Sequence, residues 1–272
     1  MLRTRRRTYR ENGSPAVVRR WDSIEMRGYR PQTYGDEIAE VYDDWLPGGF
    51  SEQAAAETAE FLADLVPGGR ALELGIGTGR VALPLAARGV EVHGIDASES
   101  MVAKLRAKPG GADLPVTTGD FADVPVDGDF DLVYVVFNTF FQLLTQEDQI
   151  RCAGNVAARL RPGGRFVVEA FVPDLGRFHR EQVVGANLIG LDRVRLEVTQ
   201  HDRLAQTVTS QHVMIGTGGI QLMPVRLRYC WPSELNLICR LADLHLTDRY
   251  GGWRREPFNS ASGSHVSVYT KA

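Results

Sequence analysis

The chain has 272 residues, of which 43% are hydrophobic and 24% are charged, and its formal net charge is −3. These values are typical of a globular protein without a general attraction to nucleic acid, and no apolar run approaches the roughly 18 residues of a membrane span. The three cysteines lack the spacing of metal ligands, so we expect buried free thiols, no metal centre and a cytoplasmic location.

The chain begins with an arginine-rich segment. Residues 1–25 hold seven arginines against three acidic residues, a net charge of +4. Such a segment is typical of a phosphate-binding arm or of an organelle transit peptide. Because it has no sustained amphipathic period, we favour a mobile arm over residues 1–30 and assign it no chemistry.

Two helices are predicted to follow the arm. Tyr34–Leu46 is expected to form a short helix, which Ile38, Val41 and Trp45 would dock through their helical spacing. Ser51–Val66 is alanine-rich and begins with a serine that suits the N-cap position, so it is predicted to be the first long helix.

A glycine-rich turn follows a short apolar strand. The strand at Arg70–Leu72 leads into Glu73–Arg80, whose glycines are spaced Gly-x-Gly-x-Gly, and Val81–Ala87 is predicted to continue as a helix. Glycine has no Cβ, so such a turn bends sharply and lets a ligand approach its N–H groups. The turn predicts a ligand-binding loop of a kind that several nucleotide folds share.

Four further apolar segments are predicted to be strands. They are Val90–Asp96, Pro115–Phe121, Phe130–Asn138 and, after the turn at Arg161–Arg165, Phe166–Ala170. Helical stretches separate them, which predicts a parallel sheet covered on both faces. Asp96 lies about 20 residues beyond the glycine turn, where nucleotide folds place a carboxylate on the ribose hydroxyls.

After the fifth strand the pattern changes to alternation. The segments Val194–Val198, Thr207–Ile215 and Val225–Tyr229 alternate or are rich in strand formers, with breaks expected at Gln200–Arg203 and Gly216–Gly219. Alternation with one polar face is typical of antiparallel strands. It predicts an inserted three-stranded sheet over residues 185–230.

The insertion divides the chain. Residues 31–184 are expected to form the core, and residues 231–272 to complete it. This last part is predicted to hold a helix over Ser233–Leu241 and strands over Leu246–Tyr250 and His265–Tyr269.

Taken together and in this order along the chain, these motifs resemble those of the class I S-adenosylmethionine-dependent methyltransferases, and the resemblance covers roughly residues 34–271. The resemblance rests on Glu73–Gly79, Asp96, Asp120–Phe121 and the Leu160–Gly164 turn. Nicotinamide dehydrogenases usually show Gly-x-Gly-x-x-Gly instead. The resemblance implies an α/β fold: a Rossmann-like, doubly wound, mostly parallel seven-stranded sheet with helices on both faces, and a small antiparallel insertion over the active site.

The resemblance also implies S-adenosyl-L-methionine as the cofactor. The glycine turn would hold its amino-acid end, Asp96 the ribose and Met101 the adenine, with Asp120 and Phe121 at the adenine edge. The expected cofactor-binding residues are Tyr42, Glu73, Gly75, Gly77, Gly79, Arg80, Asp96, Ala97, Met101, Asp120, Phe121 and Phe137. Tyr42 and Trp45 are expected in a lid, where aromatic faces can support a cation.

The end of the fourth strand is expected to lie beside the methyl donor, because ligands bind beyond the carboxyl ends of parallel strands. Asn138 there would orient the substrate or cofactor, or alternatively cap the next helix. DNA amino-methyltransferases carry an Asn/Asp-Pro-Pro-aromatic motif at this place, and Asn138–Phe141 has no proline, which disfavours that substrate class. The expected substrate-binding residues are Trp45, Asn138, Gln142, Glu169 and Tyr250.

Methyl transfer requires an acceptor atom held in line with the methyl group and, for a hydroxyl, a general base. A histidine suits that role near neutral pH. His179, His201 and His212 lie in or beside the predicted insertion, so each is a candidate catalytic residue alongside Asn138, or else an ordinary strand or surface residue.

We therefore expect a methyltransferase that acts on nitrogen or oxygen of a small molecule in bacterial specialised metabolism, as a monomer or homodimer. An RNA or protein methyltransferase is one alternative, and it would carry a basic track beside its pocket. A non-catalytic cofactor-binding regulatory protein is the other. Neither a membrane nor nucleic acid is an expected partner.

Overall fold

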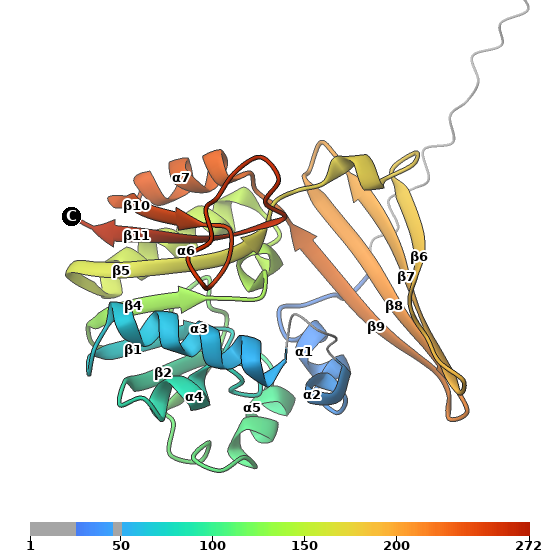
Figure 1. Ribbon diagram of the computed structural model, residues 1–272, viewed down its shortest axis with the longest axis horizontal. Helices are drawn as coiled ribbons and strands as arrows, with labels where there is room; N and C mark the ends of the chain where they lie inside the picture. Colours follow the sequence, from blue (N-terminus) through green and yellow to red (C-terminus); the bar gives the residue numbers. More distant parts are fainter. Residues whose placement is uncertain (1–25, 46–50) are drawn as a thin grey trace, which may run out of the picture.

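A seven-stranded sheet and a separate four-stranded sheet organise the protein in a computed structural model that describes residues 26–45 and 51–272 (Figure 1). In sheet order, the larger sheet consists of β10 (Leu244–Tyr250), β11 (Ser264–Lys271), β5 (Leu160–Phe171), β4 (Phe130–Val135), β1 (Arg70–Leu74), β2 (Glu91–Asp96) and β3 (Val116–Thr118). The arginine-rich residues 1–25 lie outside the described residues.

The larger sheet is mostly parallel. The strands β3, β2, β1, β4 and β5 pair in parallel, whereas β11 is antiparallel to both β5 and β10. This confirms the predicted fold class. One boundary differs: β5 already includes the predicted turn at Arg161–Arg165, and its pairing with β4 shifts register between Phe130 and Leu132.

Helices cover both faces of this sheet (Figure 1). They are α3 (Glu52–Leu65), α4 (Ala82–Ala86) and α5 (Glu99–Arg106) on one face, and α6 (Gln146–Arg159) and α7 (Pro232–Arg240) on the other. The side chain of Ser51 accepts a hydrogen bond from the N–H of Ala54, as expected of the N-cap of α3. Of the helices in the described ranges, none is long and apolar enough to cross a membrane.

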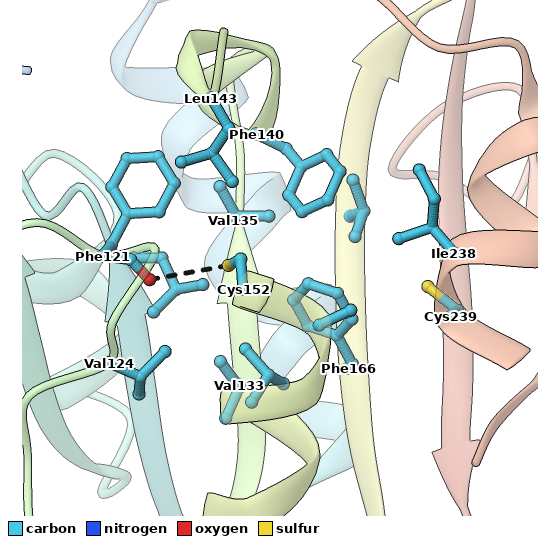
Figure 2. Packing of buried hydrophobic residues seen from close by; sticks show 14 of the residues in the cluster. Phe121, Val124, Val133, Val135, Phe140, Leu143, Cys152, Phe166, Ile238 and Cys239 are labelled. Atoms are coloured by element: carbon cyan, nitrogen blue, oxygen red, sulfur yellow. Dashed lines mark hydrogen bonds between the residues drawn. The ribbon is translucent and has the colours of Figure 1, made fainter. Parts of the chain in front are cut away.

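Strand β4 shows why the buried part of a central strand is mainly apolar. Leu132 packs into the cluster beneath α3 and α4, whereas Val133 packs into the cluster beneath α6 and α7. A strand buried on both faces needs apolar residues at every position. Figure 2 shows the second cluster, in which the Cys152 thiol lies 3.5 Å from the carbonyl oxygen of Phe121. The three cysteines are buried free thiols, as predicted.

The predicted helix Tyr34–Leu46 is wrong as a single element. The structure has α1 (Thr33–Ile38) and α2 (Tyr42–Trp45), with a turn between them. The break lets Ile38 and Ala39 bury their side chains in one cluster, while Tyr42 faces a pocket described below. The backbone of Trp45 ends α2, and its side chain lies outside the described part of the chain.

The smaller sheet holds four strands rather than the predicted three. They are β6 (Gln182–Ile189), β7 (Arg193–Asp202), β8 (Thr207–Gly216) and β9 (Gly219–Arg228), all antiparallel. Strand β6 carries Gly185, and its register shifts between Ala186 and Leu188, so its sequence does not alternate cleanly. The break predicted at Gln200–Arg203 begins too early, because β7 continues to Asp202.

The smaller sheet covers the carboxyl end of the larger one. Strand β9 contacts α1, and α1 in turn contacts α5 of the core. In Figure 1, α1 and α2 accordingly lie between the core and the four-stranded sheet. The antiparallel insertion over this edge is confirmed.

Candidate active site

The glycine turn after β1 has the backbone that its sequence predicts. Gly77 and Gly79 have φ angles of 55° and 77°, values that residues with a Cβ rarely adopt. A Cβ on Gly79 would also lie 2.2 Å from Cδ1 of Leu105, whereas one on Gly77 would meet nothing closer than 4.0 Å. Gly79 therefore permits close packing, and Gly77 leaves space in front of the turn.

Asp96 ties this turn to the end of β2. Its Oδ2 accepts a hydrogen bond from the N–H of Gly77 at 2.7 Å, and its Oδ1 accepts one from the N–H of Ser98 at 2.8 Å. Burial raises the pKa of Asp96, and these two donors oppose that rise. The carboxylate keeps further lone pairs that can accept hydrogen bonds from a ligand.

A pocket opens between the turn and the two N-terminal helices. Its lining residues are Pro31, Tyr34, Gly35, Tyr42, Gly75, Gly77, Asp96, Ala97, Ser98, Met101, Asp120, Phe121, Thr139 and Gln142. Eight of the twelve predicted cofactor residues are among them. A neighbouring pocket shares Pro31, Asp120, Phe121 and Gln142 and extends toward Tyr29 and Asp148.

Within the described part of the chain, four predicted cofactor residues do not line this pocket: Glu73, Gly79, Arg80 and Phe137. Glu73 is 3% exposed behind the turn, and its Oε2 accepts a hydrogen bond from the hydroxyl of Tyr134 at 2.9 Å. Burial raises the pKa of Glu73 to about 8. No sequence pattern marks this carboxyl as buried, because an acid beside a ligand-binding turn suggests exposure.

Arg80 lies between two aromatic rings. Its guanidinium carbon is 4.6 Å from the ring centroid of Tyr42 and 5.3 Å from that of Phe137. Such stacking on aromatic faces is typical of arginine. Arg80 thus connects the lid helix α2 to the end of β4.

Polar contacts hold the lid helices against the core. Asp36 of α1 accepts a hydrogen bond from the Ser98 hydroxyl at 2.6 Å. Asp43 of α2 accepts one from the Thr78 hydroxyl at 2.7 Å, and it forms an ion pair with Lys108 at 2.7 Å. These residues were not predicted, because they lie far apart in the sequence and only the fold brings them together.

The ends of β4 and β5 lock together beside the turn. Asn138 has a φ of 63°, and its Oδ1 accepts a hydrogen bond from the N–H of Phe171 at 2.6 Å. It does not cap the following 3-10 helix η2 (Thr139–Gln142) with its side chain, which was the alternative interpretation. The Glu169 carboxylate accepts a hydrogen bond from the N–H of Phe137, and burial raises the pKa of Glu169 to about 7.

The three candidate histidines lie in different surroundings. His179 is exposed, whereas His201 is buried, stacks on Phe178 at 4.6 Å and lies 2.9 Å from the Tyr229 hydroxyl. His212 lies on β8, on the face that is turned toward α1. Of the described residues that line the two pockets, none is a histidine.

Two of the predicted substrate residues, Gln142 and Tyr250, lie in different parts of the structure. Gln142 lines both pockets. Tyr250 instead packs edge-on against Phe61 of α3, at 5.8 Å between ring centroids, on the edge strand β10.

Comparisons with known proteins agree with this geometry. A family model described as a methyltransferase domain matches residues 71–164. The structure of the CcbJ methyltransferase from Streptomyces caelestis is 41% identical with a TM-score of 0.83, over 90% of this chain and 100% of that one. The cypemycin N-terminal methyltransferase of a Streptomyces species is 28% identical over 242 residues, 88% of this chain and 97% of that protein.

A further solved structure supports the fold alone. CalS10, described as an amino pentose methyltransferase from Micromonospora echinaspora involved in calicheamicin biosynthesis, was solved with S-adenosylmethionine bound. It is 22% identical, with a TM-score of 0.66, over 86% of this chain and 97% of that one. Because the chain spans the whole of a methyltransferase to which it is 41% identical, and carries the glycine turn and Asp96 in place, it belongs to the class I S-adenosylmethionine-dependent methyltransferases.

Proposed function

We propose that the enzyme transfers the methyl group of S-adenosylmethionine to nitrogen or oxygen of a small-molecule acceptor in bacterial specialised metabolism. The observation that carries this proposal is the pocket that joins the glycine turn and Asp96 to Tyr34 and Tyr42 of the lid. The four-stranded sheet, which contacts α1 and η2 at this edge through β9, is proposed as a substrate cap. The likeness to CcbJ and to the cypemycin methyltransferase of Streptomyces supports the proposal.

The pocket residues fit the cofactor by their chemistry. The carboxylate of Asp96 suits the two donor hydroxyls of a ribose, and Met101 and Phe121 offer apolar contacts to an adenine. Arg80, which lies beside the turn but outside the pocket lining, suits the carboxylate of the cofactor's amino-acid end, because guanidinium binds carboxylate through paired hydrogen bonds. When bound, the cofactor supplies an activated methyl group.

The acceptor would bind beyond the ends of β4 and β5. Asn138 holds these ends together through Phe171, so that the positions of Phe137 and Gln142 are fixed. Glu169 is proposed to accept a hydrogen bond from the acceptor. Because its pKa is about 7, its ionised carboxylate can also take up a proton from the acceptor near neutral pH. Positioning of this kind supplies much of the catalysis that an in-line displacement needs.

The charges around the pockets favour a small acceptor over RNA. Asp96, Asp120 and Asp148 line the two pockets, against Arg30. A nucleic-acid site would need cations along such a surface. The buried free thiols fit a reducing compartment, so we propose a cytoplasmic enzyme.

A methyl-transfer screen tests the proposal. The purified full chain would be incubated with S-adenosylmethionine and with amino sugars, phenols, amino acids and tRNA, and the products would be analysed by mass spectrometry. We expect a gain of one methyl group on at least one small molecule and none on tRNA. Transfer to tRNA alone would refute the small-molecule assignment, and binding of S-adenosylhomocysteine without turnover on any acceptor would favour the non-catalytic alternative.

A further inference from the structure

The inner face of the smaller sheet, which is turned toward α1, mixes apolar side chains such as Val208 and Met214 with buried polar ones. Strand register places Arg195, Thr199, His201, Ser210 and Met223 on one face, and these residues are between 0% and 7% exposed. The opposite face carries exposed apolar side chains, namely Val184, Val198, Ile215 and Leu222. The buried polar side chains on the inner face suit a polar occupant, because polar groups are costly to bury against apolar atoms alone.

This inner face reaches the cofactor pocket. Met223 packs against Ile38 and Met101, and Met101 lines the pocket. His212 pairs with Met223 across β8 and β9, and Glu197 pairs with His212 across β7 and β8. Directly opposed residues share a face of the sheet, so Glu197 and His212 lie on the same face as Met223, the face that contacts the pocket residue Met101.

Glu197 is the centre of a hydrogen-bond network. Its carboxylate accepts from Arg177 at 3.3 Å, from Asn187 at 3.3 Å and from the Thr199 hydroxyl at 3.1 Å. The Thr199 hydroxyl also lies 2.8 Å from that of Ser210, which extends the network into the sheet. All three bonds to the carboxylate are longer than the roughly 2.7–2.9 Å that is usual for charge-assisted hydrogen bonds.

A carboxylate has about four acceptor positions, so three long bonds leave it able to accept a shorter one from a ligand. Burial alone would raise the pKa of Glu197, but the hydrogen bond from Asn187 and the charge of Arg177 outweigh it and lower that pKa. Burial lowers the pKa of His212, so its imidazole is neutral near pH 7. The network thus presents an ionised acceptor beside a neutral ring.

The surrounding charge selects the kind of donor. Arg177 and Arg195 both lie near the carboxylate of Glu197, and their positive charges oppose the binding of an ammonium group beside it. A hydroxyl has no such conflict. We propose, on the basis of the proposed function, that Glu197 is a specificity-determining residue that binds a hydroxyl group of the acceptor, at a distance from the atom that is methylated.

Matched pairs of secondary amines test this inference. Piperidine, its polyhydroxylated analogue deoxynojirimycin and aminomethylpiperidine, which adds an ammonium group instead of hydroxyls, would be titrated by calorimetry into full-length protein saturated with S-adenosylhomocysteine. We expect deoxynojirimycin to bind about tenfold or more tightly than the other two amines. The Glu197→Gln variant should remove this preference and leave the affinity for S-adenosylhomocysteine unchanged.

The control variant is Glu181→Gln, which makes the same chemical change at an exposed carboxylate paired with Arg203. It should keep the preference. Ser210→Ala, which removes the far hydroxyl of the network without changing its charge, should weaken deoxynojirimycin binding by a smaller factor; this variant retains a readout if Glu197→Gln fails to fold.

Equal binding of the three amines, tighter binding of aminomethylpiperidine, or a preference that survives in Glu197→Gln would overturn the inference. The same holds if none of the amines binds while S-adenosylhomocysteine does. If the wild-type protein does not bind S-adenosylhomocysteine, the proposed function fails instead.

Discussion

Replacing Glu73 by glutamine should change how the stability of the protein depends on pH. The carboxyl of Glu73 is 3% exposed, and burial raises its pKa from 4.5 to about 8. The unfolded chain therefore releases this proton near pH 4.5, and the folded chain holds it until about pH 8. Within this window the folded state binds more protons, so the free energy of unfolding falls as the pH rises.

The magnitude follows from the two pKa values. Between pH 5 and pH 8, a group with pKa values of 4.5 unfolded and about 8 folded lowers the free energy of unfolding by about 3.5 kcal/mol. Glutamine has the same size and can still form a hydrogen bond with the Tyr134 hydroxyl. Because the glutamine amide does not titrate, the Glu73→Gln variant should not show this fall in the free energy of unfolding between pH 5 and pH 8.

Urea unfolding of the cofactor-free protein at pH 5 and pH 8 measures the difference. The wild type should lose about 3.5 kcal/mol more than Glu73→Gln between the two conditions. The exposed Glu60 provides a control, because Glu60→Gln makes the same change at the surface of α3. If Glu73→Gln and the wild type show the same pH dependence, the burial argument for this carboxyl is wrong.

Three further outcomes follow from the site. Asp96→Ala should weaken S-adenosylhomocysteine binding by at least about 1.5 kcal/mol in calorimetry, and unchanged affinity would remove Asp96 from the cofactor site. Glu169→Gln should abolish an acidic limb near pH 7 in the pH profile of kcat, because the proposed ionised form is lost as the pH falls below about 7; an identical profile would exclude this role. Gly79→Ala should lower the melting temperature more than Gly77→Ala, since only the former places a Cβ 2.2 Å from Leu105; equal losses would show that backbone conformation alone matters.

Local signals were sufficient to predict the cofactor half of the site. The glycine spacing predicts the backbone conformation of the turn, and the position of Asp96 at the end of the next strand predicts that it lies beside the turn. Both signals come from residues that are close in the sequence. The central strands were predictable because burial on both faces leaves a run of consecutive buried, mainly apolar residues, as in Leu132–Val135.

The rest of the site and the smaller sheet depend on contacts between residues that are distant in the sequence. The hydrogen bond between Tyr134 and Glu73 joins residues that are 61 positions apart in the sequence, and no local pattern predicts that the Glu73 carboxyl is buried. Strand β6 was missed because Gly185 and the register shift at Ala186 disturb its alternation, whereas pairing with β7 supplies the strand. The sequence predicted a break at His201 because its neighbours are polar. In the structure His201 belongs to β7, where it pairs with Val208 of the neighbouring strand β8.

The position of α1 has a kinetic consequence. This helix contacts α5, which bears Met101 of the cofactor pocket, and also contacts β9, which bears Met223 beside the proposed acceptor surface. The donor pocket and the proposed acceptor surface therefore share α1 as one wall. A substitution that displaces this helix should weaken donor and acceptor binding together, which a rise in both KM values would report.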